Sequence, residues 1–254
     1  MNFDSLADRY TRHTGTLRGI VRHTLVARQM ANHLPPPPAR IVDVGGGAGA
    51  QAIPLARQGY GVTLLDPSEE MLRRAHEALQ GESPAIRDRV RLVRGTGEDA
   101  CRVLGEERFD AVLCHGVTMY VDDPEPLVHA LISLTRRGGT ISLLTKNQEA
   151  LAMRPALEGR YRDALSALEA DRDTGGMGVP TRAHPLGQLM DWLREGGTEV
   201  VRWYGVRVFT DHLGHQEAGP DVEEVLELEW QAGQRDPYRR VARLIHVIGV
   251  RREG

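Results

Sequence analysis

The chain has 254 residues, of which 41% are hydrophobic and 26% charged, with 32 Lys and Arg against 35 Asp and Glu. This composition suits one large α/β domain with a small insertion and excludes collagen-like and disordered chains. No apolar run approaches the roughly 20 residues that span a bilayer, and the first residues contain no apolar signal-peptide core. Two cysteines, Cys101 and Cys114, make neither a disulfide framework nor a zinc site, so we expect free thiols in a cytoplasmic protein without a metal.

The net charge of −3 argues against indiscriminate binding of nucleic acid, but the arginines are unevenly distributed. Residues 1–40 contain six arginines against two acids, and the last twenty residues also contain six against two. Binding of nucleic acid is therefore compatible with this chain only if its arginine-rich ends fold onto one face.

Strand and helix patterns alternate along the chain. The expected strands cover 40–44, 62–65, 90–93, 109–114 and 140–144, followed by two β-rich segments at 199–209 and 243–250. The expected helices cover 3–33, 50–58, 67–79, 156–170, 186–194 and 217–229. This order predicts an α/β, Rossmann-like sheet of seven strands with an antiparallel last strand, covered by helices on both faces. We expect an N-terminal helical arm or lid over 1–34 and a main domain over 39–254, into which 148–186 insert as a substrate cap.

A glycine-rich loop, Gly45-Gly-Gly-Ala-Gly49, follows the first strand and opens a helix whose N-terminal amides can face a ligand. Asp66 ends the second strand, where a carboxylate binds the ribose of either a nicotinamide or an adenosyl cofactor. Asp43, inside the first strand, would repel a pyrophosphate and suit an ammonium group. Glu98, after the third strand, can accept a hydrogen bond from an adenine amino group. These acids favour S-adenosylmethionine over a nicotinamide cofactor.

Through Ile41-Val-Asp-Val-Gly-Gly-Gly-Ala-Gly49 the sequence resembles the class I S-adenosylmethionine-dependent methyltransferases. It resembles more specifically the tRNA 5-carboxymethoxyuridine methyltransferases, in the blocks Asn2-Phe3-Asp4, Thr16-Leu-Arg-Gly19 with Arg22, Cys114-His-Gly-Val117, Gly205-Val-Arg-Val-Phe-Thr-Asp211, Leu226-Glu-Leu-Glu229 and Ile245-His-Val247. Those enzymes methylate a carboxylate on a modified wobble uridine. The resemblance also implies a lysine-rich stretch in the insertion, where this chain has Asp173-Thr-Gly-Gly-Met-Gly-Val-Pro180 without a base. Losing such phosphate contacts would weaken RNA binding.

The chemistry of the residues and the resemblance together predict which residues form the site. The cofactor S-adenosylmethionine, with S-adenosylhomocysteine as product, would be held by Arg22, Asp43, Gly45, Gly46, Gly47, Asp66, Pro67, Gly97, Glu98 and His115. The candidate catalytic residues are His115, beside the methionine portion of the cofactor, and Arg207, which would orient an anionic acceptor. Arg18 and Tyr204 complete the predicted substrate site. A carboxylate acceptor is already a nucleophile, so alignment matters more than a general base.

Each candidate also has a structural alternative: a solvated surface charge for Arg22, a buried hydrogen-bonding residue for His115 and a structural ion pair for Arg207. We predict a methyltransferase that acts on a carboxylate or hydroxyl oxygen, by resemblance on tRNA, with a small anionic metabolite as the alternative substrate. Two alternatives remain: an NAD(P)-linked oxidoreductase, which the glycine loop and Asp66 also suit, and a non-catalytic protein that binds an adenosyl ligand. No membrane partner is expected, and a homodimer is compatible with the sequence.

Overall fold

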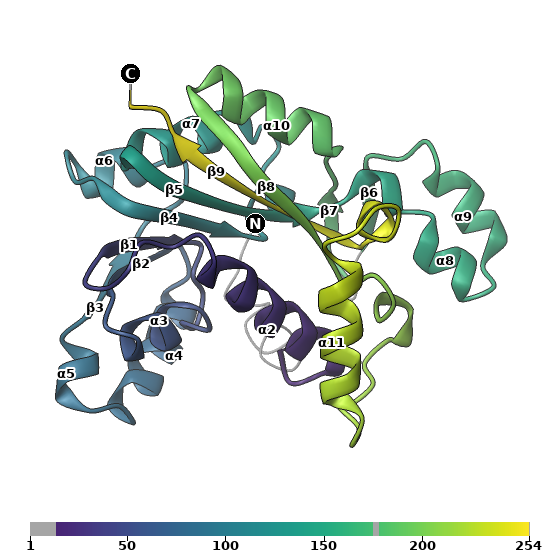
Figure 1. Ribbon diagram of the computed structural model, residues 1–254, viewed down its shortest axis with the longest axis horizontal. Helices are drawn as coiled ribbons and strands as arrows, with labels where there is room; N and C mark the ends of the chain where they lie inside the picture. Colours follow the sequence, from purple (N-terminus) through teal and green to yellow (C-terminus); the bar gives the residue numbers. More distant parts are fainter. Residues whose placement is uncertain (1–13, 175–177, 254) are drawn as a thin grey trace.

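The computed structural model describes residues 14–174 and 178–253. A seven-stranded sheet forms its centre, with the strand order β3-β2-β1-β4-β5-β9-β8 (Figure 1). The strands are β1 (Arg40–Val44), β2 (Gly61–Asp66), β3 (Val90–Arg94), β4 (Phe109–His115), β5 (Thr135–Lys146), β8 (Thr198–Val206) and β9 (Leu244–Arg251). The last strand, β9, lies between β5 and β8 and runs antiparallel to both, whereas β1 to β5 pair in parallel. The predicted fold class is therefore confirmed.

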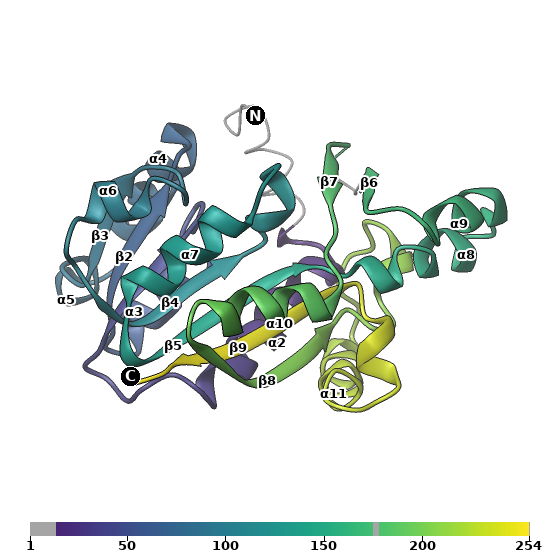
Figure 2. The same cartoon turned by 90° about the horizontal axis from the view of Figure 1, so that it is seen from above.

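Helices cover both faces of this sheet. The helices of the described residues are α2 (Leu17–Ala31), α3 (Ala52–Arg57), α4 (Glu69–Gln80), α5 (Pro84–Arg87), α6 (Ala100–Leu104), α7 (Glu125–Leu134), α8 (Met153–Leu157), α9 (Tyr161–Ala167), α10 (Leu186–Glu195) and α11 (Val222–Ala232), of which α8 and α9 lie beyond the end of the sheet (Figure 2). One face carries α6, α7 and α10, and the other carries α2, α3 and α11 (Figure 1). The central strands are apolar on both sides, as parallel strands between two helix layers require; Ile41, Leu113 and Ile141 are fully buried. None of the described helices is long and apolar enough to cross a membrane.

The N-terminal helix α2 is part of the packed fold. Thr16 caps its first turn, where its side-chain oxygen accepts a hydrogen bond from Gly19 N at 3.3 Å. Leu17, Val21 and Leu25 form a buried stripe at helical spacing, which packs against α11. Residues 1–13, which include the start of the predicted helix over 3–33, lie outside the described residues.

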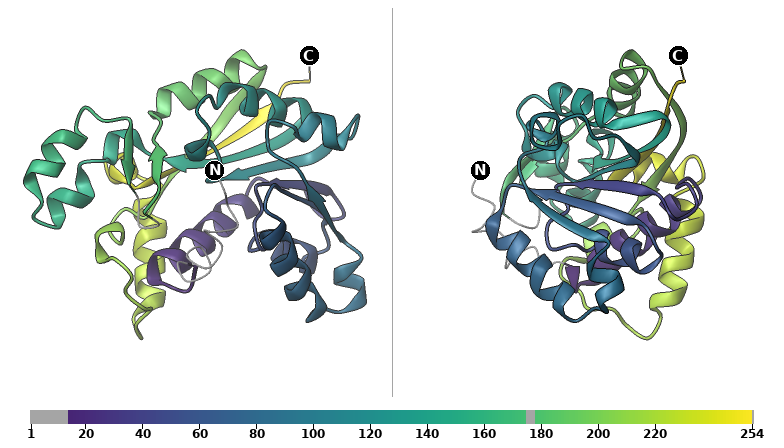
Figure 3. Two further views of the ribbon diagram at one scale, coloured as in Figure 1. Left: turned by 180° about the vertical axis from the view of Figure 1, so that it is seen from behind. Right: turned by 90° about the vertical axis from the view of Figure 1, so that its left-hand side faces the viewer.

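Residues between β5 and α10 extend beyond the end of the sheet, as Figures 2 and 3 show. They form α8, α9 and a small hairpin of β6 (Arg172–Thr174) and β7 (Pro180–Arg182). The single helix predicted over 156–170 is wrong, because Gly159 adopts a φ of +75° and divides the segment into α8 and α9. The predicted cap over 148–186 contains these elements.

The strand predicted over 199–209 ends earlier, at Val206. Arg207 has a φ of +62°, outside the β region, and is the one non-glycine residue with positive φ in the described part of the chain. The expectation that the β-rich segment over 199–209 includes Arg207 as a strand residue is therefore wrong. A buried carboxylate, that of Glu229 on α11, binds the next three backbone amides and turns the chain away from the sheet.

Candidate active site

A cavity of about 420 Å³ opens at the carboxyl ends of β1, β2, β3 and β4, a volume in the range of small-molecule sites. Its lining comes from the loops that follow these four strands and from α2. The predicted cofactor residues that line it are Arg22, Gly45, Gly47, Asp66, Pro67, Gly97, Glu98 and His115. Asp43 and Gly46 line a smaller adjoining cavity, which shares Arg22, Gly45 and His115 with the larger one. The sheet thus brings all ten predicted cofactor residues together.

Asp66 organises the glycine loop. Its Oδ2 accepts a hydrogen bond from Gly47 N at 2.8 Å, and its Oδ1 accepts one from Ser68 N at 2.9 Å. Gly45 and Gly47 have φ values of +72° and +56°, which other residues adopt at a cost. Both carboxylate oxygens are therefore held in place by backbone amides. This arrangement fits the ribose of an adenosyl cofactor.

Asp43 supplies negative charge behind this loop. Its Oδ2 is buried and has no hydrogen-bond partner, and a Cβ added to Gly46 would lie 2.7 Å from that atom. Burial, with a contribution from the nearby Asp66, raises the pKa of Asp43 to about 7. A buried acceptor with a raised pKa is stabilised by a cation, so Asp43 fits an ammonium group such as that of S-adenosylmethionine.

Arg22 and His115 lie together at the end of β4. Arg22 Nη2 donates to His115 O at 3.0 Å, and a Cβ added to Gly116 would lie 2.7 Å from the same nitrogen. Gly116, at a φ of +82°, therefore lets the guanidinium approach the backbone. Burial and the neighbouring His246, Arg22 and His23 lower the pKa of His115 well below its usual value. This low pKa makes the His115 ring a weak base.

Gly97 has a packing role as well as its place in the lining. A Cβ at this position would collide with Leu127 of α7 and lie 3.2 Å from Val44 of β1. The glycine lets the loop after β3 approach the core closely, which places Glu98 on the cavity.

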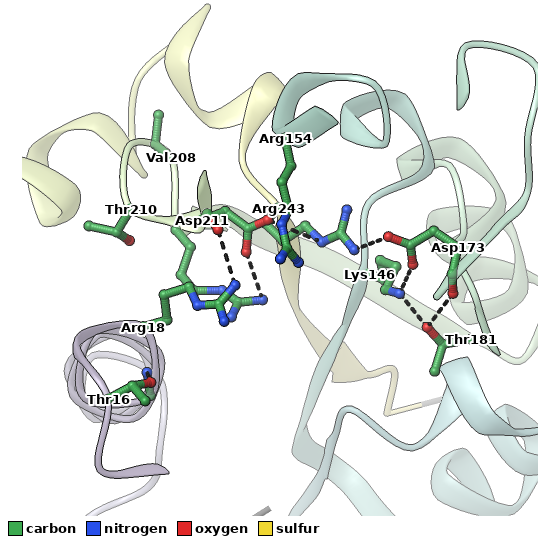
Figure 4. A network of polar contacts seen from close by, with 12 residues as sticks. Thr16, Arg18, Lys146, Arg154, Asp173, Thr181, Val208, Thr210, Asp211 and Arg243 are labelled. Atoms are coloured by element: carbon green, nitrogen blue, oxygen red, sulfur yellow. Dashed lines mark hydrogen bonds and ion pairs between the residues drawn. The ribbon is translucent and has the colours of Figure 1, made fainter. Parts of the chain in front are cut away.

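A second polar cluster lies where α2, the end of β8, the start of β9 and the cap meet (Figure 4). Asp211 is its centre: Arg18 Nη1 donates to its backbone carbonyl at 3.1 Å, and its carboxylate lies 3.3 Å from Arg207 Nη2 and 3.6 Å from Arg243 Nε. Asp173 of the cap forms ion pairs with Lys146 and with Arg243. We call Arg18, Lys146, Arg207, Arg243, Asp173 and Asp211 the arginine cluster.

The arginine cluster is buried and carries excess positive charge. Four cations face two carboxylates, and Arg18, Arg207 and Arg243 are 2%, 8% and 4% exposed. Four of their nitrogens are buried without a hydrogen-bond partner: Arg18 Nε and Nη2, Arg207 Nε and Arg243 Nη1. Burial, opposed by Asp211 and reinforced by Arg243, lowers the pKa of Arg207 to about 10. Donors and charges of this kind are stabilised by an anion.

Glu229 fixes the loop that carries Arg207 and Asp211. The Glu229 side chain is completely buried; its Oε2 accepts from Val208 N at 2.7 Å, and its Oε1 accepts from Phe209 N and Thr210 N at 2.9 Å each. The hydroxyl of Thr210 donates to Oε1 at 2.8 Å. These bonds replace the strand ladder and hold Arg207 in its left-handed conformation.

Tyr204 is not brought to either site. Its hydroxyl lies 2.8 Å from His33 Nε2, its ring stacks on Trp230, and the side chain is 4% exposed. The alternating side chains of β8 place it under α2 and α11, where it packs instead of facing the cavity. The contacts of the arginine cluster thus include Arg18 and Arg207 of the predicted substrate residues but not Tyr204.

Sequence reasoning missed six residues of these sites, of which three lie within the blocks that carried the resemblance. Gly116 belongs to Cys114-His-Gly-Val117, Asp211 to the block that begins at Gly205, and Glu229 to the acidic helix. Lys146, Arg243 and Asp173 gave no local signal. The condition that the arginine-rich ends of the chain fold onto one face is met in part, since Arg18 and Arg22 of the N-terminal segment approach Arg207 and Arg243.

Comparison with known proteins agrees with this geometry. The methyltransferase domain family matches residues 42–143, which carry most of the cavity lining. The chain is 32% identical over 251 residues to the tRNA 5-carboxymethoxyuridine methyltransferase of Escherichia coli K12, covering 97% of this chain and 94% of that protein. A ubiquinone biosynthesis O-methyltransferase of Xanthomonas campestris pv. campestris (strain B100) is 32% identical over 123 residues, about half of each chain.

Among solved structures, the magnesium protoporphyrin IX methyltransferase of Synechocystis PCC 6803, with bound S-adenosylhomocysteine, superposes with a TM-score of 0.65. The superposition covers 98% of this chain and 96% of the Synechocystis chain. At 18% sequence identity this similarity supports the fold alone. We call the 420 Å³ cavity and its smaller neighbour the cofactor cavity; the similarity to the E. coli protein spans both this cavity and the arginine cluster. The chain therefore belongs to the tRNA 5-carboxymethoxyuridine methyltransferase family and is an S-adenosylmethionine-dependent methyltransferase.

Proposed function

We propose that this enzyme methylates a carboxylate oxygen of an anionic acceptor held by the arginine cluster, and that the acceptor is a modified wobble uridine in tRNA. The observation that carries the proposal is the excess of buried positive charge around Asp211, with four guanidinium nitrogens free to donate. A carboxylate offers two planar oxygens that match the paired N–H groups of a guanidinium. The E. coli relative, by its name, acts on a carboxymethoxyuridine.

One helix contributes to both the cofactor cavity and the arginine cluster, which supports a role for both in one reaction. Arg18 and Arg22 lie one turn apart on α2, so the same helix contributes to the cluster and to the cavity. The charge of Arg22 contributes to the lowered pKa of Arg207, and both arginines act on His23. S-adenosylmethionine, when bound, supplies a methyl group on a positively charged sulfur. The residues of this chain align acceptor and cofactor, and a carboxylate needs no base.

His115 then contributes a hydrogen bond and not a proton transfer. The lowered pKa of His115 makes it a weak base, as a carboxylate acceptor allows. Arg207, together with Arg18 and Arg243, would orient the acceptor carboxylate. Pro67 and Glu98 line the cavity beyond Asp66, where they suit the adenosine portion of the cofactor.

A small carboxylate metabolite is the second candidate acceptor. The arginine cluster is enclosed, and Asp173 of the cap neutralises Lys146 and Arg243 in the place where the resemblance implies a lysine-rich stretch. A cap that compensates cations offers less attraction for phosphates than one that exposes them. This observation favours a small anion and makes the identity of the acceptor the first property to test.

The test is a comparison of tRNA nucleosides, analysed by mass spectrometry, from cells with and without the gene. Loss of a uridine methyl ester on deletion, restored by the wild-type protein and not by Arg207→Ala, is the expected result. Purified enzyme should transfer labelled methyl groups to tRNA from the deletion strain. An unchanged nucleoside profile, with no transfer to that tRNA, would contradict the RNA substrate and leave the small carboxylate.

A further inference from the structure

A chain of buried hydrogen bonds connects the cofactor cavity to α2 through the interior of the sheet. His115 Nε2 lies 2.8 Å from Ser142 Oγ, which lies 2.7 Å from His246 Nε2. His246 Nδ1 lies 2.6 Å from Gln29 Oε1. Ser142, His246 and Gln29 are at most 1% exposed, so water does not compete for these bonds. The chain joins four elements, β4, β5, β9 and α2.

The Gln29 amide sets the direction of this chain at one end. Its Nε2 donates to Gly205 O at 3.5 Å, so its oxygen must face His246. The reversed amide would place Gln29 Oε1 against Gly205 O, two acceptors without a proton between them, and would turn the Gln29 NH2 group toward His246. Gln29 Oε1 accepts the hydrogen bond, and His246 Nδ1 therefore carries the proton and donates it to Gln29 Oε1.

The donor–acceptor direction of this hydrogen bond fixes that of the next ones, because His246, Ser142 and His115 each have one proton to donate. Burial and the neighbouring His33 lower the pKa of His246 to about 3, so this ring is neutral and its Nε2 is an acceptor. Ser142 then donates its hydroxyl proton to His246 Nε2. Its oxygen accepts from His115, which must carry its proton on Nε2. The other ring nitrogen, His115 Nδ1, is left with a lone pair.

We propose that Gln29, His246 and Ser142 act as positioning residues that fix the tautomer of His115, so that its Nδ1 is held as a hydrogen-bond acceptor at the cofactor site. His115 Nδ1 is buried without a partner, as is Asp43 Oδ2, and both residues line the small cavity next to the glycine loop. Two such acceptors suit the three N–H bonds of an ammonium group. This inference rests on the proposed placement of His115 beside the methionine portion of the cofactor.

The tautomer can be measured without cofactor, substrate or turnover. In protein labelled with ¹⁵N-histidine, two-bond ¹H–¹⁵N correlations show which ring nitrogen carries the proton, and His115→Asn assigns the signals. The wild-type protein should show His115 protonated on Nε2. Because this measurement involves no methyl transfer, its outcome is independent of whether the acceptor is tRNA or a small carboxylate.

Three variants test the origin of the tautomer. Gln29→Met removes the acceptor, so His246 should move its proton to Nε2, Ser142 should donate to His115, and His115 should become protonated on Nδ1. Gln29→Glu retains an acceptor for His246 Nδ1 and, with its buried carboxyl protonated and donating to Gly205 O, should keep the wild-type tautomer. Gln80→Met removes a second glutamine that contacts a histidine, His76, on the exposed face of α4, and should change nothing at His115.

Cofactor binding provides the second readout. Gln29→Met should weaken the binding of S-adenosylmethionine about tenfold in calorimetry, as expected when a charged group loses one hydrogen bond. Gln29→Glu should bind close to wild type. A His115 protonated on Nδ1 in the wild-type protein would overturn the proposal, and so would a Gln29→Met variant that is folded by circular dichroism and keeps both the wild-type tautomer and affinity.

Discussion

The cofactor cavity and the arginine cluster are built in opposite ways. The cavity is formed by short loops after four neighbouring strands, and acidic groups, Asp43 and Asp66, dominate it. The arginine cluster combines α2, β5, β9, the cap and the loop after β8, and positive charge dominates it. One site suits a ligand with a cationic portion, and the other suits an anion. A reaction that joins such partners is favoured by their attraction as well as by alignment.

The two sites also differ in how their charges are stabilised. Asp66 is held by two backbone amides that belong to the same loop system, so it is prepared before any ligand binds. The guanidiniums of the arginine cluster retain unpaired donors and share one central carboxylate, Asp211. The cavity is therefore preorganised, whereas the cluster is left with an electrostatic cost that an anionic acceptor relieves. Variants that separate cofactor binding from turnover test this difference.

The largest effect is expected at the cofactor site. Asp66→Ala should weaken binding of S-adenosylmethionine about 100-fold or more, because it removes ribose contacts to a charged group and frees the Gly47 amide. Calorimetry measures the affinity. Asp191→Ala, which removes an exposed ion pair with Arg194 on α10, is the matched control and should bind S-adenosylmethionine with wild-type affinity. Equal affinities of the two variants for S-adenosylmethionine would contradict the assignment of Asp66 to the cofactor site.

A comparable loss, confined to turnover, is expected in the arginine cluster. Arg207→Ala should reduce kcat/KM about 100-fold while the affinity for S-adenosylmethionine stays unchanged, because the proposed contact of its guanidinium with the acceptor is lost. Arg207→Gly should show the same turnover, but its free energy of unfolding should exceed that of Arg207→Ala by about 1 kcal/mol, since the backbone has a positive φ here. Normal turnover in either variant would contradict the role of Arg207.

A smaller effect is expected from the residue that shapes the cluster. Glu229→Gln replaces one of the two carboxylate oxygens that accept hydrogen bonds from the amides of residues 208–210 by an NH2 group. Arg207 should then lose its fixed orientation, and KM for the methyl-accepting substrate should rise about tenfold. Steady-state kinetics and cofactor calorimetry measure the two effects separately. In an Arg207→Ala background the same substitution should change KM little, because both act through one guanidinium. Additive effects would show that Glu229 acts elsewhere.

The smallest effect concerns pH. The pKa of Asp43 is raised to about 7 in the folded protein, so its ionisation destabilises the ligand-free fold as pH rises from about 4 to 7. A bound ammonium favours the ionised form, so affinity for S-adenosylmethionine should rise about fivefold between pH 6 and 7, with release of a proton. Asp43→Asn should show weaker binding without this pH dependence, and greater stability than wild type at pH 7. Calorimetry in buffers of different ionisation enthalpy measures the protons.

Local patterns predicted the cofactor site because its parts are local. A glycine loop after a strand, and an acid at the end of the next strand, converge wherever parallel strands are adjacent, so Asp43, Gly45 and Asp66 could be grouped by their sequence positions alone. The same reasoning misplaced Arg207, since apolar residues on both sides of it continue the strand pattern while Glu229, 22 residues later, ends the strand. Tyr204 was likewise misjudged, because the packing of α2 and α11 over β8 decides which way its side chain faces.

By itself the sequence determined the seven-stranded fold and the family, since periodicity and loop chemistry follow from neighbouring residues. It also identified the cofactor and predicted the residues that line its cavity. Only the tertiary structure decided that Arg18, Arg207 and Arg243 share Asp211, that Asp173 of the cap compensates Lys146, and that a buried chain from Gln29 reaches His115. Apart from the pair of Arg207 and Asp211, these contacts join residues 27 to 217 positions apart. Buried charges and hydrogen-bond direction depend on such partners, which no local pattern contains.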